Sequence, residues 1–292
     1  MANSINTNGG ALIALQTLNA TNKALETTQN RVNTGLKVSS AKDNGAIFAI
    51  ATAQRAEMGA QDAVKQSLQR GQSIVDVALA AGDTVTSALN ELKSLAVAIQ
   101  DDAGNAAGDD FSANGKKLVA DYEAIVKEVH SALAGASFDG VNLFKANTAA
   151  IQVTTNTAAS NNKFDLRAAS GAASATSLAF GGTADAANGT WTAAATYAAK
   201  KAAYEPADVE TAINAFSTTL ADFGTKSKSL DRQLSFVGKL QDSLETGVGN
   251  LVDADLAKES ARLTALQTKQ QLGVQALSIA NSSSSIMLSL FR

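Results

Sequence analysis

The sequence predicts a mainly α-helical protein: a long antiparallel helical hairpin, or coiled-coil rod, with paired terminal helices and a small β-rich insertion in the middle. Three observations lead to this fold class. Two long segments repeat apolar or small residues at heptad spacing, both ends of the chain are almost free of charge, and the segment between the heptads is rich in Ala, Thr, Ser, Asn and Gly. Sustained heptads are typical of helices that pack side by side.

The first heptad seam runs from Val64 to Ile99. Every position reached in alternate steps of four and three residues is apolar or small, which predicts one long helix. The residues of this seam expected to pack inside the rod are Leu68, Val75, Val85, Leu89 and Leu92.

The second seam runs from Val209 to Leu251 and predicts a helix of roughly 65 Å. Pro206 stands just before it, where a missing amide hydrogen is harmless and the fixed φ favours a helix start. A shorter seam from Leu118 to Leu133 predicts a third helix that bundles with the two long ones. The expected rod-packing residues of the second seam are Phe216, Leu220, Leu230, Leu234 and Val237.

The two ends carry no charged side chain before Lys23 and none from Gln270 to Phe291, yet leucine and isoleucine recur in both at helical spacing. Such helices need cover on more than one side, which favours pairing and assembly with other copies. A membrane span is disfavoured because the C-terminal stretch also contains glutamines and the run Ser282–Ser285. Disordered ends are the alternative.

The segment from about Asn142 to Glu205 has few charges and no helical seam. Short β-branched or alternating pieces at 151–155, 164–166 and 178–180 predict strands and turns. We therefore expect a β-rich insertion at one tip of the rod.

The composition argues against an enzyme. There is no cysteine, only one histidine, and aromatic residues make up 5% of the chain, so no catalytic residue, metal site or cofactor is expected. A net charge of −3 without a basic stripe argues against nucleic-acid binding. His130 is expected on a helix surface or at an interface, and the paired acids at 101–102 and 109–110 in a solvated loop, with a calcium site as the alternative.

The acids near the C-terminal seam have a structural interpretation as well. Asp253, Asp255 and Glu259 are spaced so as to favour a helix start or to pair with Lys258 and Arg262.

Several short motifs together resemble the bacterial flagellin family, in its short alphaproteobacterial form. They are INTN at 5–8, RVNTGLK at 31–37, SAKDN at 40–44, AIA at 49–51, FDGVNLF at 138–144, DADLAKE at 253–259, TKQQ at 268–271 and the stretches 275–280 and 288–291.

The resemblance implies a hairpin-like chain that polymerises into the hollow helical filament used for swimming. It implies that residues 1–40 and 253–292 form the two halves of an inner-tube domain, that 41–145 and 206–252 form the halves of a rod domain, and that 146–205 form a small outer insertion. The residues expected to pack in the inner tube are Ile5, Leu12, Leu15, Leu18, Leu25, Leu256, Leu263, Leu266, Leu277, Ile279, Ile286 and Leu290.

The partners implied are many copies of the same chain, sister flagellins, junction and cap proteins, an export chaperone and the flagellar type III export apparatus. The expected location is the extracellular filament, reached without a cleavable signal peptide, since the N-terminus has no basic start followed by a long apolar run. We expect no nucleic-acid partner and no membrane span.

Two alternatives remain open. A hook–filament junction protein would have similar terminal helices. An adhesin or carbohydrate-binding module would work through Phe164, Phe180, Trp191 and Tyr197 of the middle segment, although the packing of a β insertion is a commoner use of such aromatics.

Overall fold

The computed structural model describes residues 8–105, 107–145, 151–157, 163–166, 178, 180–185 and 190–289, with the backbone alone at 185 and 283–289. Ile5 and Leu290 therefore lie outside the described residues, as does the side chain of Ile286.

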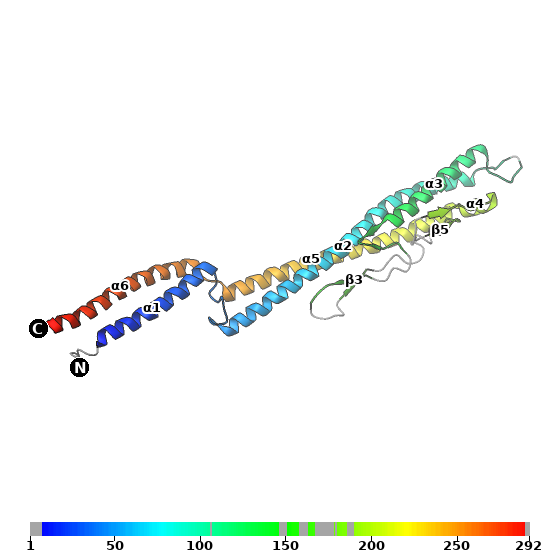
Figure 1. Ribbon diagram of the computed structural model, residues 1–292. Helices are drawn as coiled ribbons and strands as arrows, with labels where there is room; N and C mark the ends of the chain where they lie inside the picture. The colour runs from blue at the N-terminus through cyan, green and yellow to red at the C-terminus, as the bar shows by residue number, and fades with distance from the viewer. Residues whose placement is uncertain are drawn as a thin grey trace. The chain divides into compact units, whose positions relative to one another are not determined.

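The described chain is mainly helical, with small hairpins between its third and fifth helices, so the predicted fold class is confirmed (Figure 1). The helices are α1 (Gly9–Thr34), α2 (Gly45–Gln100), α3 (Ala113–Gly135), α4 (Tyr197–Ala203), α5 (Pro206–Val252) and α6 (Leu256–Ser289). The strands are β1 (Ser137–Phe138), β2 (Val141–Asn142), β3 (Ile151–Thr154), β4 (Lys163–Leu166), β5 (Thr183–Asp185) and β6 (Thr190–Thr192).

The chain divides into two compact units, and α2 and α5 contribute to both. One unit is drawn from Met1–Met58 and Asp242–Arg292, and the other is Gly59–Gln241. We call the first the terminal unit and the second the rod unit.

In the rod unit α2 and α5 lie side by side and run antiparallel (Figure 1). Polar contacts between them follow opposite chain directions. They join Asp62 to Gln241 at 2.7 Å, Gln72 to Asp231 at 2.5 Å, and Lys93 to Glu210 at 3.2 Å.

The core of the rod unit is one continuous apolar cluster drawn from the heptad seams of α2 and α5, the buried face of α3, and the hairpins. Phe144 is fully buried and stacks on Phe216, with ring centroids 5.5 Å apart, while Tyr122 stacks on Tyr204 at 4.4 Å. The bulky side chains are thus gathered in this unit, where they supply most of the apolar burial that stabilises the monomer.

His130 does not lie on a helix surface, which was one of the two places expected for it. His130 is fully buried, and its Nε2 lies 2.8 Å from the carbonyl oxygen of Leu178 in the middle segment. The predicted seam of α3 is borne out in part, because Tyr122, Val129 and Leu133 are buried and Leu118 and Ile125 are partly buried. The buried face is wider than the seam and also includes Val119, Val126 and His130.

The hairpins are short and antiparallel, and pair β1 with β2, β3 with β4 and β5 with β6. The turn between β1 and β2 uses Asp139 (φ 51°) and Gly140 (φ 75°), a left-handed pair that suits a tight hairpin. Asp139 also forms a 2.6 Å ion pair with Arg70 of α2. The β3–β4 hairpin packs on α2 at Gly71, where an added Cβ would lie 2.6 Å from Val153.

The middle segment also contains a helix that the pattern of strands and turns did not predict. Thr196 caps α4, since its hydroxyl accepts from the Ala199 amide. The Lys200 ammonium then binds Glu123 of α3 at 2.5 Å, and the Tyr204 hydroxyl donates to the same carboxylate. These contacts attach α4 to α3, which explains a helix in a segment of weak helical periodicity.

Candidate assembly surface

The terminal unit pairs α1 with α6 in antiparallel fashion. The Asn8 amide donates to the carbonyl oxygen of Ala280 at 2.8 Å, and the Gln270 amide donates to Asn22 at 2.8 Å. The residues of α1 that the pair buries are Thr21 and Thr28. The contact between the two helices therefore includes buried polar side chains beside leucines, such as Leu18 and Leu25 of α1, that are partly covered.

An ion pair lies at the other end of this contact. The Arg31 guanidinium reaches Glu259 at 3.2 Å, with side-chain exposures of 26% and 11%. The sequence favoured Lys258 or Arg262 as the partner of this acid, whereas the structure pairs it with a residue of the other helix. Arg31 approaches from α1 at a largely buried point, where an opposite charge stabilises the carboxylate more strongly than at the surface.

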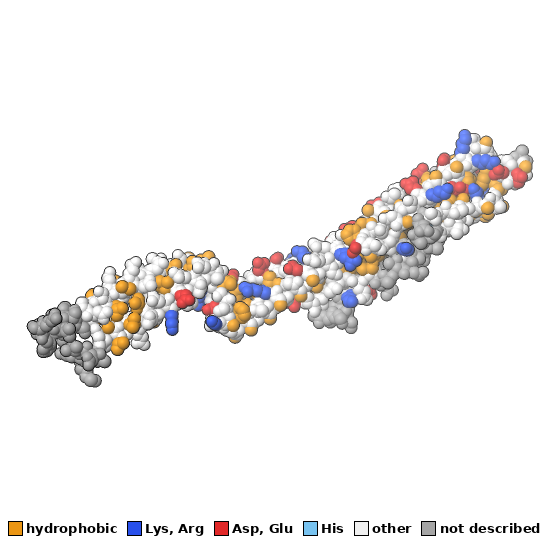
Figure 2. Space-filling model, in the orientation of Figure 1, with side chains coloured by type: hydrophobic (Ala, Val, Ile, Leu, Met, Phe, Trp, Pro, Cys, Tyr) orange, Lys and Arg blue, Asp and Glu red, His pale blue; other side chains and the backbone are white. Residues whose placement is uncertain are grey.

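Several large apolar side chains of α1 and α6 lie outside their mutual contact. Leu12 is 62% exposed and Ile13 68% exposed on α1, and Ile279 is 70% exposed on α6. Figure 2 shows hydrophobic side chains on the visible surface of this helix pair. Large apolar groups left in water along two adjacent helices indicate a surface that is covered by another molecule.

A shallow groove of about 430 Å³ follows α1 within this surface. Leu12 and Leu15 form its apolar part, and Gln16, Asn19 and Lys23 form its polar edge. The groove is therefore suited to an apolar side chain flanked by polar groups.

The predicted inner-tube residues fall into two groups in the described chain. Four are exposed, whereas the others are partly covered: for example, an added Cβ at Gly273 of α6 would lie 3.3 Å from Leu18. The exposed ones are Leu12, Leu15, Leu256 and Ile279, and the partly covered ones are Leu18, Leu25, Leu263, Leu266 and Leu277.

The predicted rod-packing residues lie in the rod unit at the contact of α2 and α5. Leu220 and Leu234 are partly buried and pack against the core. The buried ones are Leu68, Val75, Val85, Leu89, Leu92, Phe216, Leu230 and Val237.

Sequence reasoning missed several residues of the terminal unit, among them Ile13, Val274 and Thr21. Ile13 and Val274 are exposed apolar residues outside the chosen seams, and Thr21 is a buried polar residue. Ile13 is adjacent to Leu12, and Val274 stands three residues before Leu277. Their position next to predicted residues could have identified both. A search for one apolar stripe discards such residues because they lie beside it.

The aromatic residues considered for an adhesin pack inward in the rod unit. Phe180 and Trp191 are buried in its core, and Phe164 and Tyr197 are partly buried against it. The Tyr197 ring also meets that of Phe111 edge-on, with centroids 4.6 Å apart. The packing of these side chains therefore accounts for all four positions.

The chain segments between the helices of the terminal unit are joined by backbone hydrogen bonds. The Lys37 amide donates to the carbonyl oxygen of Val252 at 2.6 Å, and the Ala254 amide donates to that of Gly35 at 2.8 Å. Gly35 has φ 71° and ends α1 in the left-handed conformation that glycine favours. Asp255 accepts from the Lys258 amide, which confirms its predicted role at a helix start.

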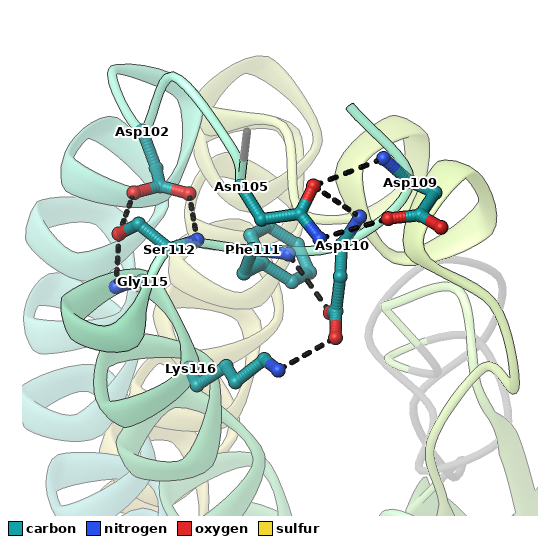
Figure 3. A network of polar contacts seen from close by, with 8 residues as sticks. All are labelled: Asp102, Asn105, Asp109, Asp110, Phe111, Ser112, Gly115 and Lys116. Atoms are coloured by element: carbon teal, nitrogen blue, oxygen red, sulfur yellow. Dashed lines mark hydrogen bonds and ion pairs between the residues drawn. The ribbon is translucent and has the colours of Figure 1, made fainter. Parts of the chain in front are cut away.

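The polar side chains of the acidic loop before α3 are hydrogen-bonded to groups of the loop itself and of the start of α3 (Figure 3). The Asp102 carboxylate accepts from the Ser112 hydroxyl, the Ser112 amide and the Gly104 amide, and these bonds lower its pKa. Asp110 forms a 2.6 Å ion pair with Lys116. The carboxylates thus hold the turn and the start of α3.

Within the described part of the chain, no three His, Asp or Glu side chains gather in a way that could hold a metal ion. No described helix is long and apolar enough to cross a membrane.

Comparisons with known proteins match both ends of the chain. The bacterial flagellin N-terminal helical region matches residues 5–149, and the bacterial flagellin C-terminal helical region matches 207–291. Flagellin FljM of Caulobacter vibrioides is 50% identical over 99% of both chains, and a flagellin of Brucella melitensis is 40% identical over 99% of both. A solved Bacillus cereus flagellin is more distant: 19% identical, TM-score 0.44, covering 59% of this chain and 88% of that one.

The two matched regions contain α1, α2 and α3 on one side and most of α5 and α6 on the other, and so include the exposed apolar surface described above. The chain belongs to the bacterial flagellin family and is a structural, non-enzymatic subunit of the extracellular flagellar filament.

Proposed function

We propose that α1 and α6 are the part of the subunit that lines the inner tube of the filament, and that their exposed apolar residues are covered there by other copies of the chain. The observation that carries this proposal is that Leu12, Ile13 and Ile279 stay exposed to water in the free subunit although α1 and α6 are paired. Burying one such side chain contributes about 1.5–3 kcal/mol, so several of them supply a substantial driving force for polymerisation.

The same proposal assigns the domains. Residues 1–40 and 253–292 form the inner-tube domain, 41–145 and 206–252 form the rod domain, and 146–205 form the outer insertion. The antiparallel pairing of α1 with α6 and of α2 with α5 supports this division, because each pair brings the two halves of one domain together.

Ile279 provides the test. Ile279→Asp should leave the free subunit folded, because the side chain is already 70% exposed there, and should prevent its burial between copies. We expect the critical concentration for polymerisation to rise by about tenfold or more, since about 1.4 kcal/mol corresponds to a factor of ten. Polymerisation is measured by sedimentation and electron microscopy, and folding by circular dichroism.

Two controls make this test specific. Ile279→Leu keeps the apolar surface and should polymerise almost normally. Ser278→Asp places the same charge at the neighbouring exposed position of α6. If Ile279→Asp subunits form filaments at the normal concentration, Ile279 is not part of the assembly surface.

We further propose that the chain coassembles with sister flagellins, contacts junction and cap proteins at the filament ends, and is carried by an export chaperone to the flagellar type III apparatus. Family membership supports these partners. Coassembly is tested by polymerising a mixture of this chain and a sister flagellin that carry different fluorescent labels. Filaments that each contain a single label would contradict it.

A further inference from the structure

Three asparagines in the described chain are followed by glycine: Asn8, Asn44 and Asn114. An asparagine in this position can cyclise when the next backbone nitrogen attacks its side-chain carbonyl carbon, Cγ. Glycine favours the attack because it has no side chain to obstruct the nitrogen and leaves the backbone free to adopt the required conformation. The surroundings of each pair then decide whether the reaction can occur in the folded protein.

Asn114 is protected by its place in α3. The Gly115 amide, which would have to attack, donates a 3.0 Å hydrogen bond to the Ser112 hydroxyl (Figure 3). Gly115 is buried, and an added Cβ there would lie 2.5 Å from the Asp102 carboxylate. The Gly115 nitrogen is therefore held in a hydrogen bond, and the atoms around it leave little room for movement.

Both polar atoms of the Asn8 side-chain amide are hydrogen-bonded. Its Oδ1 accepts from the Ala11 amide at 3.0 Å, and its Nδ2 donates to the carbonyl oxygen of Ala280 at 2.8 Å. Loss of the side-chain amide would break the bond to α6, so the paired helices oppose the reaction.

Asn44 shares the bond from the amide three residues on, but no hydrogen bond from its Nδ2 and no bond or close contact at its following glycine is found among the described residues. It is exposed, and its Oδ1 accepts from the Ile47 amide at 3.2 Å, which polarises the side-chain carbonyl at the start of α2. Gly45 is the first residue of α2, where an amide has no helical acceptor, and no other backbone acceptor is found for it among the described residues. No atom lies within 4 Å of a Cβ built at Gly45.

We propose that Asn44 is a site of spontaneous deamidation in the folded subunit. The Gly45 nitrogen forms a bond to Cγ of Asn44, the bond from Cγ to Nδ2 breaks, and Nδ2 leaves as ammonia with the proton from the Gly45 amide. The product is a five-membered succinimide. Water then opens either of its two carbonyls and produces aspartate or isoaspartate at position 44.

The two products act differently on α2. Aspartate keeps the cap to Ile47 and adds a negative charge at the N-terminus of the helix, where the helix dipole stabilises it. Isoaspartate adds a methylene to the backbone and removes that cap. Folded subunits in which both products form therefore become chemically heterogeneous at the start of α2.

The test follows the full-length monomer during incubation at neutral and mildly alkaline pH. Trypsin releases Asn44 in peptide 43–55 and Asn114 in peptide 94–116, so both sites are read by mass spectrometry from one digest, with fragment ions locating the change. We expect Asn44 to deamidate at least about tenfold faster than Asn114, because the latter must wait for local opening of α3. The Asn44 rate should rise with pH, and incubation in heavy-oxygen water should place the label in peptide 43–55.

Two controls separate the effect of the fold from that of the sequence. In denaturant, the rates at Asn44 and Asn114 should become similar, because both are then plain Asn-Gly pairs. The variant N44Q should show no mass gain in peptide 43–55. An intact Asn44 in the folded monomer, or an Asn114 that reacts as fast as Asn44, would overturn the proposal.

Discussion

Among individual residues, His130 makes the stability of the rod unit depend on pH. Burial lowers the pKa of His130 below its ordinary value of 6.5, and the bond to Leu178 only partly opposes this effect. The folded protein therefore keeps His130 neutral while the unfolded chain protonates it, so this contribution to stability is present above about pH 6.5 and is lost as the pH falls below it.

We expect His130→Gln to reduce this dependence while an amide donor remains to reach Leu178. Between about pH 7.5 and 5.5, the free energy of unfolding of the unmodified chain should fall more steeply than that of His130→Gln. The difference is limited to about 1.4 kcal/mol per pH unit for one proton. Urea unfolding at several pH values measures it, and equal slopes for the two proteins would contradict the assignment.

The ion pair between Arg31 and Glu259 should matter more than a surface pair. Arg31→Met leaves a nearly buried carboxylate without its counter-ion, and we expect a loss of about 1–3 kcal/mol. Lys93→Met breaks the pair with Glu210, whose side chains are both well exposed, and should cost at most about 1 kcal/mol. A double-mutant cycle for each pair, measured by unfolding of the monomer, compares them; an equal coupling energy for both would count against the role of burial.

Among the helices, α2 contains two glycines that should respond in opposite directions to alanine. A Cβ at Gly82 would overlap the side chain of Leu220 of α5, so Gly82→Ala forces the helices apart or moves that leucine, and we expect a loss of about 1 kcal/mol or more. Gly59 has no atom within 4 Å of its would-be Cβ, so Gly59→Ala should stabilise the monomer by about 0.5–1 kcal/mol. Chemical unfolding of both variants tests the contrast, which fails if both changes have the same sign.

The packing of the helices also explains how far the sequence predicts the fold. The heptad pattern predicts α2 and α5 correctly because the apolar residues of each seam are the residues that pack in the core of the rod unit. The buried face of α3 is predicted only in part because His130, a polar residue, occupies an inward position that the pattern treats as solvent-facing. The helix α4 is missed because tertiary contacts to Glu123 stabilise it, and these join residues far apart in sequence.

The candidate assembly surface is predicted less completely, for a related reason. Apolar spacing identifies Leu12 and Ile279 as residues that need cover, but it does not distinguish cover by the partner helix from cover by another copy. The contact between α1 and α6 combines partly covered leucines, which the apolar spacing identified, with threonines, amides and the Arg31–Glu259 pair. Apolar periodicity does not identify the polar partners.

For the molecule as a whole, the two units should differ in local stability. The rod unit holds the large apolar core, whereas no large apolar side chain described on α1 or α6 is fully buried. In the monomer we expect the backbone amides of α1 and α6 to exchange with deuterium much faster than those in the middle of α2 and α5. In filaments the amides of α1 and α6 should become protected.

Hydrogen exchange followed by mass spectrometry, on monomer and on polymer, measures this change. The middle of α2 and α5 serves as the internal reference, because its protection comes from the subunit itself. Strong protection of α1 and α6 in the free monomer would contradict the view that other copies complete their packing.

The antiparallel pairing of α1 with α6 also has a consequence for synthesis. Asn8 and Arg31 find their partners 272 and 228 residues further along the chain, at Ala280 and Glu259. A nascent or prematurely terminated polypeptide therefore has α1 without its counterpart. If α1 and α6 form the assembly surface as proposed, we expect such products to lack a complete surface and to be excluded from the growing polymer.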